Sequence, residues 1–390
     1  MKAGRPPTPE QRQAEHHRWV TRAERVAELI DGHARRTDGR DPAPPVAEAE
    51  LLRQHGLLTL LTPAAHGGAG LTWRTALAAV RVLARADGRI GYLLGDHYVS
   101  NASIWLAGGP RVQSLLGRPS AERQWLWSDV VVPGAAPLEL TADGDGYRLS
   151  GTRLAPIGVA AADMTVVAAA DTGTAEPLLV GVPRESKGVS FTPEPESGVP
   201  RPDGVNVRYD RVWIPSEHVV CSLDPDTATP RSSLLGLAVQ AVSGHLCLGI
   251  AEGAMRYCRG GAPGAAPPGA RALAGYGTWL AALDAAGELA NRIAEQIGDA
   301  AARPTLTWPE RAELAARVSR LPILAADLAT EVTFGLYETT SDWPATAQQG
   351  FDRFWRDARA YTASMPLDKR RREVAQHFLT GAEPARTDLA

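Results

Sequence analysis

Several common signals are missing from this sequence. It has only three cysteines (Cys221, Cys247 and Cys258), without metal-ligand spacing and without the even number of a disulfide framework. It contains no GxGxxG or P-loop pattern, so no Rossmann dinucleotide site is expected. We find no run of about 18 apolar residues, the length that a membrane span needs, and no apolar segment of a secretory signal at the start. These absences predict a cytoplasmic protein with reduced thiols, no metal site and no membrane span.

The charge and the composition narrow the class of protein further. The formal net charge is −3, which gives no general attraction to nucleic acid or to an anionic membrane. Apolar residues make up 44% and charged residues 22% of the chain, which is typical of a globular protein. A length of 390 residues exceeds one ordinary core, so two or three domains are expected.

The hydrophobic period changes twice along the chain. Amphipathic helical patterns fill the first part, and short β-branched or alternating segments, such as "MTVVAAAD" and "PLLVGVP", follow. Helical patterns then return, with a kink expected at Pro322. The DGDG sequence from Asp143 to Gly146 predicts a hairpin within an antiparallel sheet of about seven strands. The resulting organisation is a loose tail, an N-terminal helical domain, a middle β-domain and a C-terminal helical bundle, at residues 1–13, 14–120, 121–230 and 231–390.

The C-terminal stretch "FDRFWRDARAYTASMP" joins a charged helix to a bland segment. Phe351, Phe354, Trp355 and Ala358 follow at helical spacing and predict one buried stripe. Asp352 stands four residues before Arg356, the favourable order for an ion pair on a helix. The segment that follows, "TASMP", is small and uncharged.

Five landmarks, in order, resemble the acyl-CoA dehydrogenase fold, and within it the flavin-dependent monooxygenases similar to dibenzothiophene monooxygenase and to amine and amino-sugar N-oxygenases. They are "LLTPAAHGGAGL", "ARADGRIGYLLGDHYVSN", "VVVPGAAPLELTADGDGYRLSGTRLAPIGVAAADMTVVAA", "RYDRVWIPSEHVV" and "FDRFWRDARAYTASMPLDKRRREVAQHFLTG". The resemblance implies a mainly α fold with a central β-domain and a C-terminal four-helix bundle. It also implies FMN or FAD, reduced by a separate flavin reductase, a small-molecule substrate and a homotetramer with sites between subunits.

The resemblance places the polar edge of the flavin at "LAPIGV". Related proteins often carry an aromatic residue and a hydroxyl residue here, and this chain carries neither. Hydrogen bonds to the flavin must therefore come from backbone N–H groups of Ile157, Gly158 or Val159. A plain turn at a strand end is the alternative.

"GDHYVSN" supplies candidates for catalysis. His97 and Asn101 are four residues apart and share a helix face. In related monooxygenases a histidine at this place lies near flavin and substrate, so both residues are predicted catalytic, with Asp96 and Ser100 as weaker candidates. A buried histidine satisfied by a backbone group explains the pattern equally well.

The phosphate of the flavin needs cations. Arg271 opens a helix after a glycine-rich loop, where the fold places an arginine on the flavin phosphate of a neighbouring subunit. Guanidinium suits phosphate because it makes bidentate, charge-assisted bonds. Arg356, Arg359 and Lys369 are expected to assist, and Trp213 to cap the β-domain and to wall the dimethylbenzene side of the flavin. Surface and core roles are the alternatives for these residues.

Ser364 and Met365 stand where acyl-CoA dehydrogenases carry a catalytic glutamate, and Ser364 stands where monooxygenases often carry a histidine. Neither residue can act as a base. An uncharged wall suits an oxygenase in which reduced flavin and O₂ supply the reagent, and Ser364 is kept as a candidate catalytic hydroxyl.

Three functions remain open from the sequence. The favoured one is a two-component flavin monooxygenase of secondary metabolism that oxidises a nucleophilic nitrogen, sulfur or electron-rich carbon. The second is an acyl-CoA dehydrogenase or oxidase whose base lies elsewhere. The third is a non-catalytic protein on the same scaffold.

Overall fold

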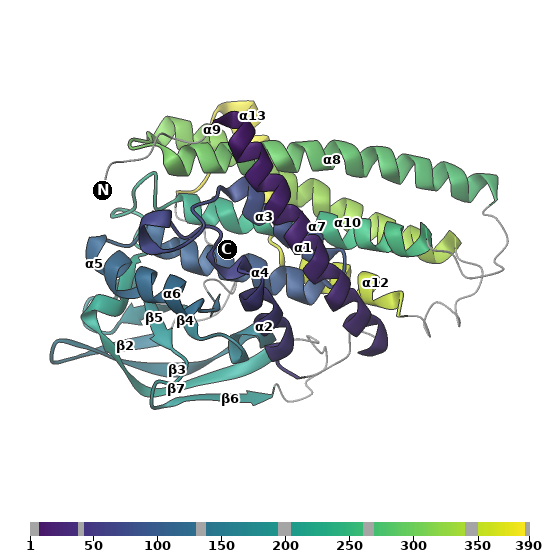
Figure 1. The fold of residues 1–390 in the computed structure, drawn as a ribbon. Helices are drawn as coiled ribbons and strands as arrows, with labels where there is room; N and C mark the ends of the chain where they lie inside the picture. Colours follow the sequence, from purple (N-terminus) through teal and green to yellow (C-terminus); the bar gives the residue numbers. More distant parts are fainter. Residues whose placement is uncertain are drawn as a thin grey trace.

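The computed structural model describes residues 8–37, 43–129, 138–193, 204–259, 269–339 and 350–386. Helices come first, strands second and helices again last, in the order that the hydrophobic period predicts (Figure 1). The N-terminal helices are α1 (Pro9–Thr37), α2 (Val46–Gln54), α3 (Trp73–Ala84), α4 (Gly88–Leu106), α5 (Pro110–Val112) and α6 (Arg118–Arg123). The C-terminal helices are α7 (Leu234–Arg259), α8 (Ala270–Ala302), α9 (Trp308–Val318), α10 (Arg320–Thr339), α12 (Asp352–Ser364) and α13 (Leu367–Thr380).

The middle of the chain forms one sheet in the order β6-β7-β3-β2-β4-β5-β8, with β1 paired to β4. The strands are β1 (Trp127–Ser128), β2 (Leu138–Asp143), β3 (Gly146–Pro156), β4 (Met164–Asp171), β5 (Pro177–Pro183), β6 (Val189–Pro193), β7 (Gly204–Pro215) and β8 (Val219–Ser222). The hairpin prediction is confirmed, because Asp143 pairs with Gly146 across the β2–β3 turn.

Two details of the predicted sheet are wrong. The described residues give eight strands instead of seven, and β4 pairs in parallel with both β1 and β2. The strand patterns in the sequence did not mark β6 and β8, which are five and four residues long and too short to show a clear period of their own. Parallel pairing depends on where distant segments dock, and alternation within one strand does not report it.

The helical segment is interrupted near Pro322, as predicted, but the interruption lies two to three residues before the proline. Helix α9 ends at Val318 and α10 begins at Arg320, so Pro322 lies in the first turn of α10. Proline is tolerated there because first-turn amides have no partner within the helix. The Asp352–Arg356 pair is also confirmed, with 3.0 Å between Arg356 Nε and Asp352 Oδ2.

Among the described helices, α7 is long and apolar enough to cross a membrane by length and composition. In the fold, 89% of its most apolar window is buried against other helices. It contacts α3, α4, α8 and α10, so its apolar surface serves the core of the protein.

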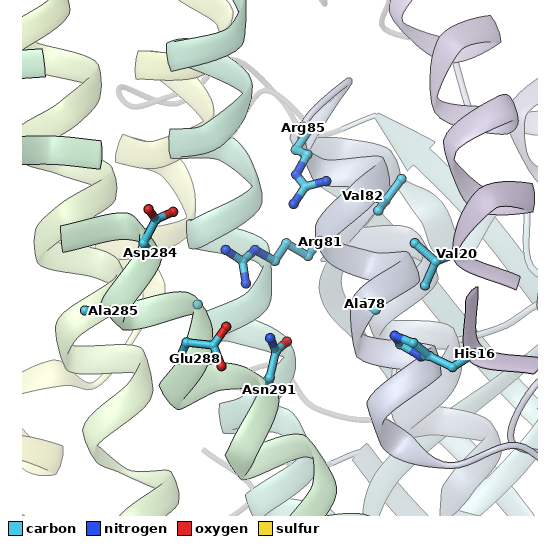
Figure 2. A pocket seen from close by; sticks show the side chains of 11 residues that line it. His16, Val20, Ala78, Arg81, Val82, Arg85, Asp284, Ala285, Glu288 and Asn291 are labelled. Atoms are coloured by element: carbon cyan, nitrogen blue, oxygen red, sulfur yellow. The ribbon is translucent and has the colours of Figure 1, made fainter. Parts of the chain in front are cut away.

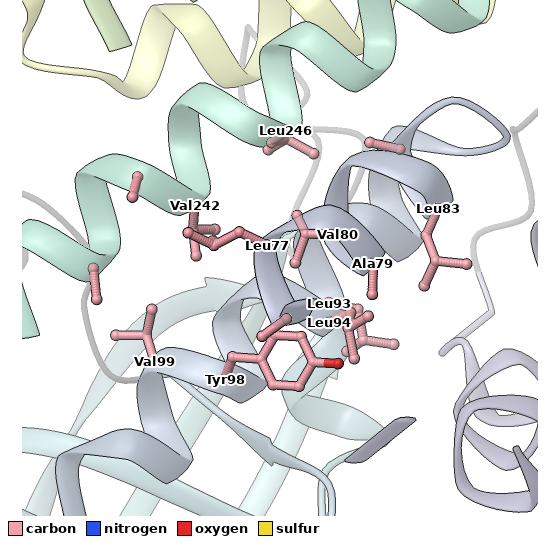
Figure 3. Close-up of a cluster of buried hydrophobic side chains, with 14 of the residues drawn as sticks. Leu77, Ala79, Val80, Leu83, Leu93, Leu94, Tyr98, Val99, Val242 and Leu246 are labelled. Atoms are coloured by element: carbon pink, nitrogen blue, oxygen red, sulfur yellow. The ribbon is translucent and has the colours of Figure 1, made fainter. Parts of the chain in front are cut away.

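Two hydrophobic clusters form the core. The larger one joins the N-terminal and C-terminal helices to one face of β4 and β5, through residues such as Val166 and Leu179. Figure 3 shows part of it, where Leu94 and Val99 of α4 lie close to side chains of α3 and to Val242 of α7. The smaller cluster lies within the sheet and contains Leu149, Val180 and Val207. Helix α4 is therefore held between the helical core and the sheet.

Close packing of α7 on α3 depends on glycine. A Cβ atom at Gly249 would lie 2.5 Å from the carbonyl oxygen of Arg81 and 2.6 Å from Ala84 Cβ. These are backbone and short side-chain atoms of α3, so neither can move aside without a shift of the helix.

We expect Gly249→Ala to destabilise the protein by about 1–2 kcal/mol, because overpacking costs about 1–3 kcal/mol and exceeds the gain in helix propensity. Gly277→Ala on α8 is the matched control, since nothing lies within 4 Å of its added Cβ. That control should stabilise by about 0.5–1 kcal/mol. Urea unfolding measures both variants, and equal stabilisation of the two would contradict the packing argument.

Candidate functional site

Helix α4 connects most of the predicted site. Leu93 lies against Gly158, where a Cβ atom would come within 2.6 Å of Leu93 Cδ1. The ring of Tyr92 stacks on that of Tyr361 in α12, with centroids 5.3 Å apart. The N-terminus of α4 is tied to α12 as well, because Asp357 accepts the Gly88 N–H at 3.2 Å. One helix therefore positions the predicted flavin-edge turn and the helix that ends at Ser364.

His97 is fully buried, and backbone groups engage both ring nitrogens. Its Nε2–H donates to the Leu58 carbonyl at 2.7 Å, and its Nδ1 accepts the Trp127 N–H at 3.0 Å. Burial lowers the pKa of the imidazole to about 4, so the ring is neutral at pH 7. These contacts match the alternative of a backbone-satisfied histidine. The catalytic role stays a prediction, and it would require one of the two hydrogen bonds to break.

Asn101 links three segments of the N-terminal region. Its Oδ1 accepts from Thr62 Oγ1 and Trp105 Nε1, each at 3.2 Å, and its Nδ2 donates to Ser120 Oγ at 3.3 Å. The side chain is 2% exposed. The amide is thus used in internal packing, and a contact with substrate stays a prediction.

The flavin-edge residues form a short turn at the end of β3. Ile157, Gly158 and Val159 open a 3-10 turn, Ile157–Ala160, with Pro156 before it. The first amides of such a turn have no partner within it, so they can donate to an acceptor outside. Val159 is buried in the sheet core, and the Ile157 side chain lies outside the described residues. The backbone N–H groups thus fit the polar edge of a flavin without side-chain help.

Trp213 lies far from this turn. On the β3–β7 ladder Trp213 pairs with Arg148, whereas Pro156 pairs with Gly204 at the other end. At about 3.3 Å per residue the two ends are roughly 26 Å apart. Trp213 packs over Gly146 and under the Arg148 guanidinium, which confirms that it covers the end of the sheet. Trp213 therefore lies far from the flavin-edge turn of its own chain, and its expected place beside the dimethylbenzene side of a flavin stays a prediction.

The Ser364–Met365 junction carries no base. Ser364 ends α12, is exposed, and donates its hydroxyl to the Tyr361 carbonyl at 2.8 Å. Met365 packs against the helical core. The nearest acidic side chains on either side are Asp357, which caps α4, and Asp368, which is exposed and pairs with Arg371. The junction itself thus carries no charge, and its place as a wall of the flavin pocket stays a prediction.

The predicted phosphate-binding cations are dispersed. Arg271 lies on the second residue of α8 and is exposed, and Arg359 is exposed on α12. Arg356 pairs with Asp352, and Lys369 is half-buried on α13. Figure 1 shows α8 on the opposite side of the molecule from β2, β3, β6 and β7. Within one chain Arg271 does not join the flavin-edge turn, so its phosphate role stays a prediction that requires a second subunit.

Two hollows lie elsewhere. One of about 620 Å³ lies between α1, α3 and α8, where Arg81 faces Glu288 and Asn291 (Figure 2). A second of about 360 Å³ adjoins it and shares Val82 and Arg85 with it. Both arginines are ion-paired with Glu252, and none of the predicted site residues lines either hollow. These hollows belong to the packing of α1 and α3 on the C-terminal helices.

A buried polar cluster that the sequence did not predict lies beside the turn. It consists of Asp129 at the end of β1, Arg153 on β3 and Tyr209 on β7. Asp129 Oδ1 accepts from Arg153 Nη2 at 2.9 Å. The sequence contains a signal for Arg153. It stands an even number of residues from Leu149 and Ala155, so all three lie on the buried face of β3, where a charged side chain needs a partner. Tyr209 follows Val205 and Val207 at the same two-residue spacing on β7, so its inward position was also readable, whereas no comparable pattern marks Asp129.

Comparison with known proteins agrees with the described fold. Residues 13–115 match the family model "Acyl-CoA dehydrogenase, N-terminal domain". A solved complex of TdsC, a dibenzothiophene monooxygenase from Paenibacillus sp. A11-2, with FMN and indole superposes with a TM-score of 0.89 at 27% identity, covering 96% of this chain and 100% of that chain. The chain has the acyl-CoA dehydrogenase fold.

Two further proteins are similar to this chain over nearly their whole length. A protein of Pseudomonas putida named "Probable FMNH2-dependent monooxygenase SfnC" is 29% identical over 357 residues, which is 87% of this chain and 90% of the relative. The methanesulfinate monooxygenase MsuC of Pseudomonas fluorescens superposes with a TM-score of 0.86 at 26% identity, covering 95% and 99% of the two chains. The homologues of this acyl-CoA dehydrogenase-fold chain are thus named as flavin-dependent monooxygenases.

We expect the stability of the protein to depend on pH through His97. Its folded-state pKa of about 4 lies below the ordinary 6.5, so the unfolded chain binds a proton first. Stability is fully present above pH 6.5 and falls as the pH drops towards 4, by up to about 3 kcal/mol from this group. His97→Gln should lower stability at pH 7.5 but flatten its dependence on pH. Urea unfolding at pH 7.5 and 4.5 measures this, and parallel slopes for the two proteins would contradict it.

Proposed function

We propose that the chain is the oxygenase component of a two-component flavin monooxygenase. It binds reduced FMN and transfers one atom of O₂ to a small nucleophilic substrate, while the other atom leaves as water and the flavin supplies two electrons. The observation that carries the proposal is the similarity over almost the whole chain to a monooxygenase solved with FMN and indole. The homologues named for FMNH2 and for sulfur substrates favour the same cofactor and chemistry.

The residues of this chain fit that chemistry. The turn at Ile157–Ala160 offers backbone donors and no charge to the flavin edge. The Ser364–Met365 junction offers a wall without a carboxylate, so the described residues give no support to proton abstraction from an acyl thioester at this place. Substrates with a nucleophilic sulfur or nitrogen, or an electron-rich ring, suit such a site.

The proposal includes assembly, location and a partner. Large apolar side chains are exposed on three C-terminal helices: Leu273 and Leu280 on α8, Phe334 on α10 and Trp355 on α12. Trp355 was expected to be buried with Phe354, but its side chain is 39% exposed. The helical bundle of a single chain therefore leaves this large apolar side chain uncovered. We propose a homotetramer, a dimer of dimers, that covers this surface. A separate flavin reductase supplies reduced flavin, and the enzyme works in the cytoplasm, in secondary metabolism.

An oxygen-incorporation assay tests the proposed function. The purified protein is incubated with FMN, NADH, a flavin reductase and isotopically heavy O₂, with indole, dibenzothiophene and methanesulfinate as first substrates. The expected result is a product that gains one heavy oxygen atom, only when the reductase and O₂ are both present. Bleaching of bound flavin by an acyl-CoA without oxygen incorporation would favour a dehydrogenase instead. Failure to bind flavin in any redox state would exclude both enzymes.

We expect Arg271→Ala to weaken FMN binding by about 1.5–3 kcal/mol, the range for a hydrogen bond to a charged group. The reason is loss of a guanidinium–phosphate contact across the subunit interface. Arg292→Ala on the same helix is the control, since Arg292 is exposed and pairs with Glu295. Flavin fluorescence titration measures both variants. Light scattering at micromolar concentration accompanies it, and a monomeric mass or an unchanged dissociation constant removes Arg271 from the site.

A further inference from the structure

Asp129 has a strained backbone that helix α4 holds in place. Its φ of 77° lies in the left-handed region, which residues other than glycine rarely adopt. Asp96 on α4 accepts the Asp129 N–H at 2.9 Å and the Ser128 hydroxyl at 2.6 Å through the same oxygen, Oδ2. Strained residues persist only when their surroundings fix them, and here the α4 carboxylate does so. The direction of the Asp129 side chain is therefore set by α4.

That side chain reaches the strand that leads into the flavin-edge turn. Asp129 Oδ1 accepts from Arg153 Nη2 at 2.9 Å, and both side chains are almost completely buried. Arg153 precedes Ile157 by four residues on β3, and β1 also contacts the turn directly. A continuous path of contacts thus runs from Asp96 through Asp129 and Arg153 to the amides of the turn.

The cluster has unused hydrogen-bonding capacity. Within the described part of the chain, Asp129 Oδ2, Arg153 Nε and the Tyr209 hydroxyl are buried without a hydrogen-bond partner. A guanidinium and a carboxyl that only had to fill space would be expected to form two parallel bonds, because the bidentate arrangement is the stronger one. Because only one hydrogen bond joins the two side chains, the strength of that bond depends on the charge of either group.

We propose that Asp129 and Arg153 are positioning residues that set the direction of the flavin-edge amides at Ile157, Gly158 and Val159. The inference rests on the proposed function, because the ligand of those amides is the flavin. The Asp129–Arg153 bond ties β3 to the end of β1 and to α4. Loss of the bond releases the strand immediately before the turn, so the amides no longer point at one acceptor. Neither residue is assigned contact with the reacting atoms.

The charge of the pair gives this role a measurable signature. Burial raises the pKa of Asp129 to about 8; the Arg153 guanidinium opposes the rise and the Asp96 carboxylate adds to it. The groups facing Asp129 are Asp96 from α4, Arg153 from β3 and Tyr209 from β7. Below pH 8 Asp129 is neutral, so the pair carries the positive charge of Arg153. Above pH 8 the pair is neutral overall, and an anionic flavin loses a favourable field.

The test measures FMN affinity against pH by fluorescence titration in the full-length protein and three variants. The wild-type dissociation constant should rise about threefold between pH 7 and pH 9, a modest effect for a charge beyond direct contact. Asp129→Asn keeps a neutral acceptor and cannot ionise. The FMN dissociation constant of this variant at pH 7 should lie within about twofold of the wild-type value, because about one hydrogen bond to a charged group is retained. The rise of that constant between pH 7 and pH 9 that the wild type shows should be absent. Since FMN titrates equally in both proteins, the difference isolates Asp129.

Substitutions of Arg153 complete the test. Arg153→Met should weaken FMN binding about tenfold or more at every pH, since a bond to a charged group is lost, and should remove the pH dependence. Arg153→Lys keeps the charge and should recover part of the affinity and the rise towards pH 9. Circular dichroism and thermal unfolding establish that each variant is folded. If Arg153→Met does not fold, the pH profile of Arg153→Lys decides in its place.

The outcomes separate the inference from the proposed function. If the wild type binds FMN and a folded Arg153→Met variant binds it equally well, the positioning role is wrong and the monooxygenase proposal stands. If Asp129→Asn keeps the wild-type pH profile, or Arg153→Lys lacks it, Asp129 is not the group that links flavin affinity to pH, and the inference is overturned. If the wild type binds no flavin in either redox state, the proposed function itself fails.

Discussion

The structure depends on the hydrogen bonding of polar side chains carried by a helix that is buried almost throughout. Helix α4 lies between the helical core and the sheet, and Asp96, His97, Ser100 and Asn101 are all inside. A buried polar group without a partner costs about 1–3 kcal/mol, so each of these side chains fixes whatever segment supplies its partner. His97 fixes the segments at Leu58 and Trp127, and Asp96 fixes the end of β1. The helix thereby aligns two segments, the one at Leu58 and β1, that hydrophobic packing alone would leave free to slide.

This requirement explains how two regions distant in the sequence, both predicted to line the flavin site, come to contact the same helix. The flavin-edge turn touches α4 through Gly158 and Leu93, and the α12–α13 junction is tied to α4 through the Tyr92–Tyr361 stack. Glycine at 158 permits the close approach, since any side chain there would meet Leu93. A turn that donates only backbone N–H groups and a wall without a carboxylate then lie along one helix. Such a site suits a cofactor that brings its own reactivity, and asks the protein for shape and exclusion of water.

The side chains predicted to form the site fall into two groups, those bonded or packed inside the protein and those on exposed helices. His97 and Asn101 have all their observed hydrogen bonds inside the protein, so their contribution to any reaction is through the shape of the site unless flavin rearranges them. Trp213 covers the opposite end of the sheet from the turn. The arginines predicted to bind the flavin phosphate lie on α8 and α12, two helices with exposed surface. The proposed assembly and the proposed phosphate contact therefore depend on the same exposed helical surface.

Local patterns in the sequence determined the order of helices and strands, the hairpin at Asp143–Gly146 and the ion pair between Asp352 and Arg356. Each of these depends on residues a few positions apart, where period and spacing are reliable guides. The resemblance of five landmarks supplied the fold and placed the predicted pocket wall at Ser364 and Met365, and the residues themselves showed that this segment is uncharged. Only the tertiary structure decided that His97 faces β1, that Trp213 lies far from the flavin-edge turn, and that Asp129 meets Arg153. Those facts depend on which distant segments dock together, and one residue's identity does not encode the direction its side chain takes once strands and helices have paired.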